Sequence, residues 1–381
     1  MFASSRPTSG MRRAIAGVAA AIFAAVVLAP APAMANMDPE PPVITGAPYV
    51  GSTLTVSWDP MAYKGCAQAS GPDTRIYWTR DGELAADHTT WPHYLLGEED
   101  RGKTIAAHLV ANHPCEGLEV ASEETAPISA SNRPNGFTSR GAFELLARRS
   151  DGALVMYPRV FNSWEPARTV GAGWNIFPTV LSPGDFDGDG SNDVLGRDSA
   201  GGLYLYSGDG SGGWNGPRKV GTGWNIFTSL VAPGDFNSDG TNDILARDAN
   251  GILYLYPGDG EGGWLPRSVA GQGWNALNAI ITPGDFDGDT NVDVLARDAS
   301  GYLRLYSGNG IGGWNGMTVV GQGWNGMSKI GSAGDINADG SLDVFAVDGS
   351  GQLRAYYGNG NAGWAGAEVV GWGWGGFTDL F

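Results

Sequence analysis

The sequence predicts an all-β protein in which a repeat β-propeller, with about five blades of four antiparallel strands, follows a small β-sandwich. Three observations support this fold class. Glycine is abundant at 61 of 381 residues, and tryptophan is high at 14. In the second part of the chain the tryptophans recur every 50 residues. Short apolar runs alternate with glycine-rich turns between them, which is typical of propellers and not of collagen.

Residues 1–35 have the organisation of a secretory signal peptide. Two arginines precede an apolar stretch, 14–28, which is short for a membrane span. Ala-Met-Ala at 33–35 supplies the small residues that signal peptidase requires. We therefore expect a secreted, extracellular protein with no membrane insertion. The formal net charge of −17 argues against nucleic acid as a partner.

Residues 36–131 are expected to form a small all-β domain, and residues 132–136 a linker. Asp81-Gly82 is a hairpin-turn signal. Three segments alternate apolar and polar residues as half-buried strands do: 54–58, 75–79 and 104–110. The order of PPVITGAPYVGSTLTVSW, YWTRDG and EEDRGKTIAAHLV resembles the Ig-like modules of bacterial surface and secreted proteins. This resemblance implies an Ig-like β-sandwich that serves as a spacer or weak adhesion unit.

The chain has two cysteines, Cys66 and Cys115. In an exported chain a disulfide between them is expected. Closing a loop of that size would contribute about 4 kcal/mol in the chain-entropy model. Two free thiols are the alternative, and neither state implies redox catalysis because no C-x-x-C is present.

Residues 137–381 are expected to form the propeller. One unit indicates how a blade is built, with strands predicted at 227–236, 243–248, 252–256 and 267–270. The first unit is truncated and lacks the Asp-rich loop of the others. The chain ends on a spare first strand, 377–381, which we expect to pair into the first blade and hide its open edge.

Four loops of nine residues concentrate acidic side chains: DFDGDGSND from 185, DFNSDGTND from 235, DFDGDTNVD from 285 and DINADGSLD from 335. Side-chain oxygens stand at positions 1, 3, 5 and 9, and position 7 can offer its backbone carbonyl. Hard oxygen ligands in that number suit calcium. We expect about four structural Ca²⁺ ions. The predicted ligands are Asp185, Asp187, Asp189, Ser191, Asp193, Asp235, Asn237, Asp239, Thr241, Asp243, Asp285, Asp287, Asp289, Asn291, Asp293, Asp335, Asn337, Asp339, Ser341 and Asp343.

The pattern D-x-[DN]-x-D-G-x-x-D between two strands resembles the calcium loops of the FG-GAP or VCBS repeat family, best known from integrin α-subunit propellers. The alternative is Asp-rich turns whose side chains cap their own backbone. Four such loops in register would concentrate mutually repelling carboxylates unless a cation were bound. The third loop has Thr290 where glycine permits a positive φ. A β-branched residue is strained there, so this loop is expected to bind calcium most weakly.

The repeated tryptophans have two interpretations: they fill the space between blades, or they stack on sugar rings beside an asparagine. The Gly-x-Gly-Trp-Asn signature is similar to tachylectin-type five-bladed lectins. The candidate ligand residues are Trp174, Asn175, Trp224, Asn225, Trp274, Asn275, Trp324 and Asn325. Repeated Arg197, Arg247 and Arg297 are each followed by Asp and are interpreted as members of structural ion pairs.

No enzyme is expected. All four histidines lie before residue 114, and neither G-x-S-x-G nor H-E-x-x-H occurs. The predicted function is a monomeric, calcium-stabilised binding module for carbohydrate or cell-envelope ligands. The alternatives are a protein-interaction or adhesion scaffold at the cell surface and an accessory part of a secreted hydrolase system.

Overall fold

The computed structural model describes residues 41–46, 48, 53–58, 75–89, 92–96, 98–100, 102–110, 119–125, 127–128, 136–138, 143–160, 163–337, 339 and 341–381. The predicted signal peptide and the predicted Cys66–Cys115 disulfide lie outside these residues. Within them, no helix has the length and apolar character that crossing a membrane requires.

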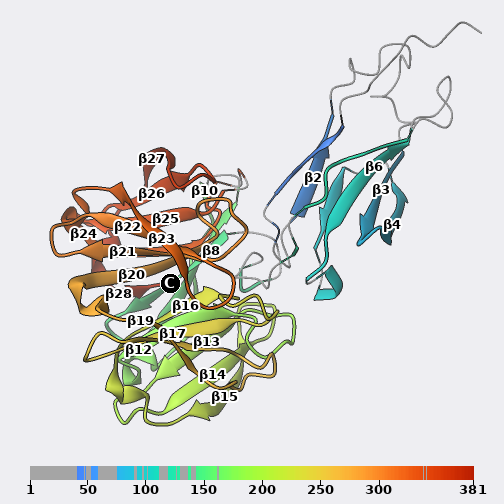
Figure 1. Cartoon of the computed structure of the whole chain (residues 1–381). Helices are drawn as coiled ribbons and strands as arrows, with labels where there is room; N and C mark the ends of the chain where they lie inside the picture. Colours follow the sequence, from blue (N-terminus) through green and yellow to red (C-terminus); the bar gives the residue numbers. More distant parts are fainter. Residues whose placement is uncertain are drawn as a thin grey trace, which may run out of the picture. The chain divides into compact units, whose positions relative to one another are not determined.

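Two antiparallel sheets form the N-terminal part (Figure 1). The first has the order β1 (Val43–Thr45), β2 (Thr53–Ser57), β5 (His93–Leu95), and the second β4 (Glu83–Thr89), β3 (Arg75–Arg80), β6 (Ile105–Val110), β7 (Glu119–Ala121), with a 3₁₀ turn η1 (Glu98–Asp100) after β5. Trp78 of the second sheet is buried and stacks on Tyr94 of the first, with ring centroids 5.4 Å apart. Asp81 and Gly82 both have positive φ, 47° and 78°, so the predicted hairpin turn is confirmed.

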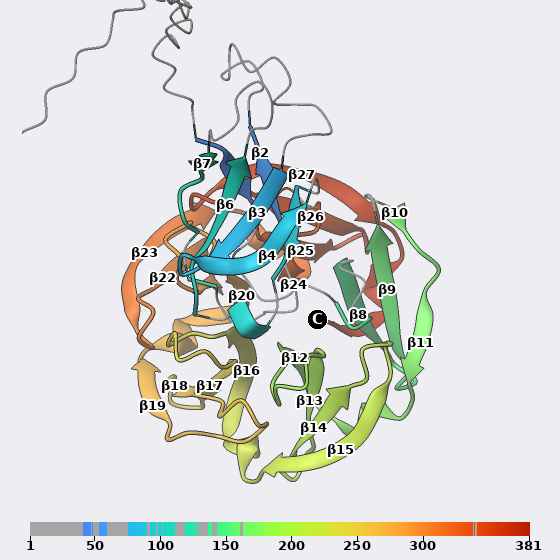
Figure 2. The same ribbon diagram turned by 90° about the vertical axis from the view of Figure 1, so that its right-hand side faces the viewer.

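Residues 137–381 form five antiparallel sheets around a centre, so this part is all-β and propeller-like (Figure 2). Sheet 1 contains β8 (Phe143–Arg149), β9 (Leu154–Val160), β10 (Ser163–Trp164), β11 (Arg168–Gly171) and β28 (Phe377–Leu380). Sheet 2 contains β12 (Thr179–Gly184), β13 (Asp193–Arg197), β14 (Leu203–Gly208) and β15 (Trp214–Gly221). Sheet 3 contains β16 (Phe227–Gly234), β17 (Asp243–Asp248), β18 (Leu253–Tyr256) and β19 (Ser268–Gly271).

Sheet 4 contains β20 (Leu277–Gly284), β21 (Asp293–Asp298), β22 (Leu303–Gly308) and β23 (Trp314–Gly321). Sheet 5 contains β24 (Met327–Gly334), β25 (Asp343–Asp348), β26 (Leu353–Gly358) and β27 (Trp364–Gly371). The strands of sheet 3 fall where the sequence predicts them, because apolar runs and turn residues mark both ends of each.

A short 3₁₀ turn follows each outer strand: η2 (Trp174–Ile176), η3 (Trp224–Ile226), η4 (Trp274–Ala276), η5 (Trp324–Gly326) and η6 (Trp374–Gly376). The Gly-x-Gly before each tryptophan explains the turn. Gly223 precedes η3 in the left-handed region, with φ 77°. A Cβ on Gly221 would lie 2.2 Å from the Trp224 indole nitrogen, so only glycine lets the ring fold back onto the strand.

The C-terminal strand completes sheet 1. β28 pairs antiparallel with β8, with Phe377 opposite Arg149 and Leu380 opposite Ala147. This places β28 at the end of sheet 1 that β12, β16, β20 and β24 occupy in the other sheets, near the centre of the ring (Figure 2). The expectation that the last residues pair into the first blade is confirmed by this register.

Candidate functional site

The four acidic loops all occupy the same place in the fold, between the first two strands of sheets 2 to 5. We call them loop 1 (185–193), loop 2 (235–243), loop 3 (285–293) and loop 4 (335–343). In each loop the position 9 aspartate begins the second strand and is completely buried. The loop before it therefore has to turn around a buried carboxylate.

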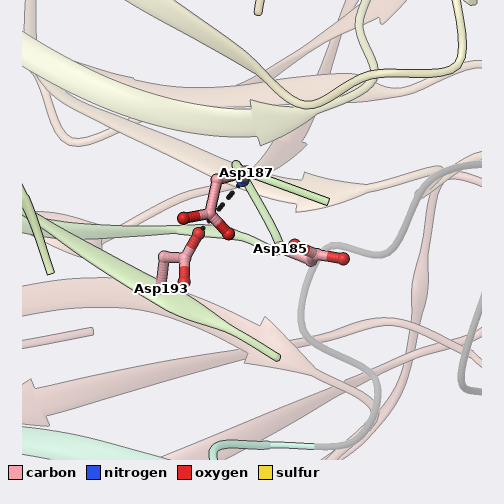
Figure 3. A group of neighbouring side chains, drawn as sticks. All are labelled: Asp185, Asp187 and Asp193. Carbon is pink, nitrogen blue, oxygen red and sulfur yellow. Dashed lines mark hydrogen bonds between the residues drawn. The ribbon is translucent and has the colours of Figure 1, made fainter. Parts of the chain in front are cut away.

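In loop 1 three carboxylates converge. Asp185, Asp187 and Asp193 each offer an oxygen, and these oxygens lie within 4.8 Å of one another. Figure 3 shows the Asp187 and Asp193 carboxylates close together, with the Asp187 backbone N–H donating to Asp193 at 3.3 Å. Asp193 also accepts from the backbone N–H groups of Phe186, at 2.8 Å, and Gly208, at 2.9 Å.

Part of loop 1 fits the self-capping interpretation. Asp185 accepts the backbone N–H groups of Gly188 at 2.8 Å and Gly190 at 3.0 Å. Asp187 differs, because its Oδ1 atom is buried and no hydrogen-bond donor of the described residues reaches it. Leaving a buried carboxylate oxygen without a partner is costly, so the loop fits a cation that supplies one.

Burial disfavours the charged form of the position 9 carboxylates. It raises the pKa of Asp193, Asp243 and Asp293 to about 8 and that of Asp343 to about 7. The neighbouring loop aspartates raise these pKa values further. A bound divalent cation would favour the charged carboxylates and so lower these pKa values again. The raised pKa values and the unsatisfied Asp187 oxygen therefore both indicate a place for a cation.

Position 3 divides the loops into two types. In loops 1 and 3 it is an aspartate that accepts a hydrogen bond from a serine hydroxyl on the third strand of the sheet. Ser207 donates to Asp187, and Ser307 donates to Asp287 at 2.5 Å. Loop 3 likewise brings Asp285, Asp287 and Asp289 within 4.8 Å.

In loops 2 and 4 position 3 is an asparagine that turns its amide toward position 5. Asn237 donates to Asp239, and Asn337 to Asp339, both at 2.8 Å. The position 7 side chains also bond within their loops, Thr241 to Asp239 at 2.6 Å and Asn291 to Asp289 at 3.1 Å.

Thr290 adopts the conformation that the sequence predicts to be strained. Its φ is 77°, beside 87° for Gly190 and 89° for Gly240 at the same position of loops 1 and 2. Its N–H donates to Asp285 at 2.9 Å, as the Gly190 N–H does to Asp185 at 3.0 Å. Loop 3 therefore keeps the common turn although its residue disfavours it. Its calcium affinity stays a prediction.

Sequence reasoning missed that residues 136–138 and Glu144 of sheet 1 make backbone contacts equivalent to those of the acidic loops. Glu144 takes the place of Asp193, since it accepts the Phe137 N–H as Asp193 accepts that of Phe186. The Gly136 carbonyl accepts the Asn192 amide, just as the Asp185 carbonyl accepts that of Asn242. The signal was the spacing, because a Phe precedes an acid by seven residues in both segments.

The four tryptophans of the predicted ligand set are buried, and this corrects their assignment as ligand contacts. Trp174, Trp224, Trp274 and Trp324 are only 4–5% exposed. Trp224, for example, packs against Phe227, Tyr256 and Trp264. Their ring faces are therefore covered by protein and cannot stack on a sugar, so the packing interpretation is the one that the burial supports.

The neighbouring asparagines are exposed and fasten the turns. The Asn275 amide donates to the Ala249 carbonyl at 3.0 Å, and Asn325 to Ala299 at 3.1 Å. Asn175 and Asn225 lie over Gly152 and Gly201, the equivalent hairpin turns of sheets 1 and 2. All four asparagines are exposed to solvent.

A second group of tryptophans links the sheets into a cycle. Each indole N–H donates to a carbonyl on the outer strand of the preceding sheet, and sheet 1 donates in the same way to sheet 5. The pairs are Trp214 to Val170, Trp264 to Val220, Trp314 to Ala270 and Trp364 to Val320, with Trp164 closing the ring on Val370. These side chains are half-buried. An apolar cluster fills each sheet boundary beneath them.

The repeated arginines do not pair with the aspartate that follows them, which corrects the ion-pair interpretation. The Arg197 guanidinium donates to the carbonyls of Trp224, at 3.0 Å, and Phe227, at 2.6 Å. Arg247 and Arg297 repeat this contact one and two units later. These arginines therefore cap the carbonyl end of the next 3₁₀ turn.

The described histidines lie in the N-terminal sheets and make structural contacts. The His108 ring stacks on Tyr77 with centroids 4.4 Å apart, and His93 bonds Thr55 at 2.9 Å. The sequence has no histidine after residue 113.

Comparison with known proteins agrees with the loop pattern. The family described as FG-GAP-like repeat matches three overlapping segments, residues 185–246, 235–296 and 285–346. No curated protein matches the sequence of the chain.

Among solved structures, the chain is similar to a lectin of Agrocybe aegerita described for recognition of non-reducing terminal N-acetylglucosamine. The identity is 13% and the TM-score 0.39, over 90% of this chain and 94% of that chain. A lectin of Burkholderia pseudomallei is similar at 20% identity and a TM-score of 0.41, over 87% and 95%. A rhamnogalacturonan lyase of Bacillus licheniformis has 13% identity and a TM-score of 0.24, over 86% and 68%. The three family matches show that residues 185–346 consist of FG-GAP-like repeats.

Proposed function

We propose that residues 137–381 form a five-bladed β-propeller that binds calcium in its acidic loops and serves as a non-catalytic binding module for carbohydrate or cell-envelope ligands. The cycle of indole–carbonyl hydrogen bonds supports the blade count, because it runs through five sheets and returns to the first. Such a ring presents equivalent surfaces at regular angles, which favours multivalent binding.

The unsatisfied Asp187 oxygen is the observation that supports calcium most directly. Asp185, Asp187, Asp189 and Asp193 would hold the ion in loop 1, together with the carbonyl of Ser191. Their counterparts would act in loops 2 to 4. Bound calcium would neutralise the clustered carboxylates and fasten the loop between two strands, a structural role.

A non-catalytic role is supported by how the charged groups are used. In the described part of sheets 2 to 5, the buried acids are the loop carboxylates. The repeated arginines are committed to backbone carbonyls. A water-activating metal would need an open coordination position next to a base. The loop side chains instead bond one another and their own backbone.

For the ligand, the half-buried tryptophans at the sheet boundaries are better candidates than the buried group. Each uses its N–H inside the protein and keeps part of the indole exposed. An aromatic surface whose orientation is fixed by a hydrogen bond suits the apolar face of a sugar ring. Five such positions recur around the ring: Trp164, Trp214, Trp264, Trp314 and Trp364.

The N-terminal sheets are proposed to form an Ig-like spacer, and the protein to be exported with Cys66 and Cys115 in a disulfide. The Trp78–Tyr94 stack joins the two sheets as a sandwich requires, and the Arg80–Asp100 ion pair, at 2.6 Å with a fully buried carboxylate, joins β3 to the turn η1.

A glycan array tests the proposal. The full chain is applied with calcium and, separately, with chelator. We expect saccharide binding that calcium supports by keeping the ring folded. A blank array would favour the alternative, a protein-interaction scaffold. Saccharide binding by a chain that folds equally well in chelator would contradict the proposed calcium sites and leave the carbohydrate-binding function standing.

A further inference from the structure

One tryptophan departs from both groups. Trp372 is 74% exposed, and no other tryptophan among the described residues is classed as exposed. It lies between the end of β27 and the turn η6 in sheet 5. A large apolar ring left in water is unusual enough to ask what covers it.

The repeat supplies an internal comparison. The equivalent positions are exposed in every unit and carry small or polar residues: Ala172, Thr222, Gln272 and Gln322. The position therefore has no packing role that requires an aromatic side chain. Only sheet 5 has an indole there.

The same turn lacks the exposed asparagine that the other four units carry, because Gly375 stands in its place. Gly375 and Gly376 stand where the first units have Asn175 with Ile176 and Asn225 with Ile226. Ile176 is 63% exposed and Ile226 58%, whereas the third and fourth units carry the small residues Ala276 and Gly326 at this position. A Cβ on Gly376 would meet no atom within 4 Å. Sheet 5 thus combines an exposed indole with open space on the same turn.

We call Trp372, Gly375 and Gly376 the Trp372 shelf. The backbone N–H of Trp374 donates to the Gly351 carbonyl at 2.9 Å. This hydrogen bond fixes the turn against the hairpin between β25 and β26. Ser350 on that hairpin is exposed. The shelf therefore places an exposed indole on a turn whose backbone is fixed, with the exposed Ser350 on the hairpin that this turn contacts.

We propose that the Trp372 shelf is a saccharide-binding subsite, present once in the ring, where a pyranose ring stacks on the indole. The proposal rests on the carbohydrate-binding function above and identifies a dominant position for it. A protein partner would need apolar neighbours around the tryptophan, because interface hot spots sit inside packed surroundings. Here the neighbours in the turn are glycines. A sugar needs only one ring face and nearby polar groups.

The test uses the full chain with calcium and an array of tetrasaccharides of glucose, galactose, mannose and N-acetylglucosamine. The best-bound saccharide is then titrated by calorimetry. Trp372→Gln installs the residue found at positions 272 and 322. We expect about tenfold weaker binding or complete loss, as for removal of an aromatic anchor, with an unchanged Tm because the side chain is exposed.

Two further variants separate the shelf from general effects. Gly376→Ile restores the bulk seen at Ile176 and Ile226 and should block the shelf without unfolding, since its Cβ has room. Ile176→Ala removes an exposed apolar side chain from sheet 1 and should leave saccharide binding unchanged.

The outcomes distinguish the two levels of the proposal. Wild-type binding that survives both Trp372→Gln and Gly376→Ile overturns the shelf and leaves the carbohydrate function standing. A wild-type chain that is folded and binds none of the tetrasaccharides overturns the carbohydrate function, and the shelf with it. If Trp372→Gln lowers Tm, the Gly376→Ile titration decides.

Discussion

Sheet 1 and sheet 2 solve the same loop in two ways. In sheet 2 the turn of loop 1 surrounds three clustered carboxylates, Asp185, Asp187 and Asp193. In sheet 1 the corresponding segment begins with Gly136 and keeps a single acid, Glu144, which makes the equivalent hydrogen bond to a Phe backbone N–H. The backbone role of position 9 is therefore shared, whereas the additional loop aspartates occur only in sheets 2 to 5, and the described carboxylates cluster in loops 1 and 3.

This difference teaches that the loop has two separable functions. A carboxylate at position 9 organises the backbone in either sheet, with Thr138 also donating to Glu144 at 2.6 Å. The additional aspartates have no counterpart in sheet 1, and we propose that they serve a cation. Sheet 1 instead obtains its closure from the C-terminal strand, through β28 and the Arg148–Asp379 ion pair.

Calcium removal should have the largest effect on this comparison. Each site held at a hundredfold excess over its Kd stabilises the fold by about 2.7 kcal/mol. Chelation should therefore lower Tm strongly, and hydrogen exchange should rise first in loops 1 to 4 and not in β8. Differential scanning calorimetry and exchange mass spectrometry measure both.

Magnesium is the matched control for calcium, because it demands a smaller octahedral site and should not restore Tm. A melting curve that ignores both chelation and calcium would contradict the proposed role of the loops.

Deleting residues 377–381 should have the next largest effect, this time on sheet 1. It removes β28 and leaves Arg148, whose side chain is 9% exposed, without Asp379. Asp379 is 34% exposed and Arg148 keeps the Trp174 and Phe177 carbonyls, so the ion pair alone contributes modestly. The loss of the strand pairing with β8 adds to it, and we expect roughly a 10 °C fall in Tm for a domain of this size. Asp379→Asn keeps the strand and removes only the charge, so its Tm should lie between those of the wild type and the deletion variant. An unchanged Tm after the deletion would refute closure by the C-terminal strand.

A smaller, pH-dependent effect is expected from Glu144. Burial raises the pKa of this carboxyl, so its folded state holds a proton more tightly than its unfolded state. The stability this contributes is complete below the unfolded pKa and is lost as pH rises through the folded pKa. Glu144→Gln keeps the neutral form, so its stability relative to wild type should improve as pH rises from about 4 to about 7.

Urea unfolding in saturating calcium measures the Glu144 effect, and Glu165→Gln, at an exposed position, serves as the control. A difference between wild type and Glu144→Gln that does not change with pH would mean that Glu144 is not the titrating group.

The sequence predicts most of the ring because its signals are local and repeated. The strands of sheet 3 follow from apolar runs bounded by turn residues, and the loops follow from aspartates at fixed spacing. The pairing of the last strand follows from counting units. The sequence does not predict hydrogen bonds between side chains of one repeat unit and backbone groups of the next. An example is Arg197, which donates to the carbonyls of Trp224 and Phe227.

The two tryptophan groups show why site prediction was harder. Gly-x-Gly before Trp224 suggests an accessible, lectin-like signature, yet those glycines exist so that the ring can fold inward. Exposure depends on tertiary packing, which spacing does not encode. Trp372 carries the opposite signal, since it breaks the repeat, and only the repeat alignment makes that visible.

The smallest expected effect concerns loop 3, whose Thr290 holds a φ of 77°. A β-branched residue in that region stores about 1–3 kcal/mol of strain. Thr290→Gly releases it but gives the unfolded chain more freedom, worth about 0.5–1 kcal/mol. The net gain should therefore be about 1 kcal/mol, with tighter calcium binding at this loop in a titration. Gly190→Thr makes the reverse change in loop 1 and should cost a similar amount. If Thr290→Gly destabilises the protein, its threonine is not strained, and loop 3 has no reason to be the weakest site.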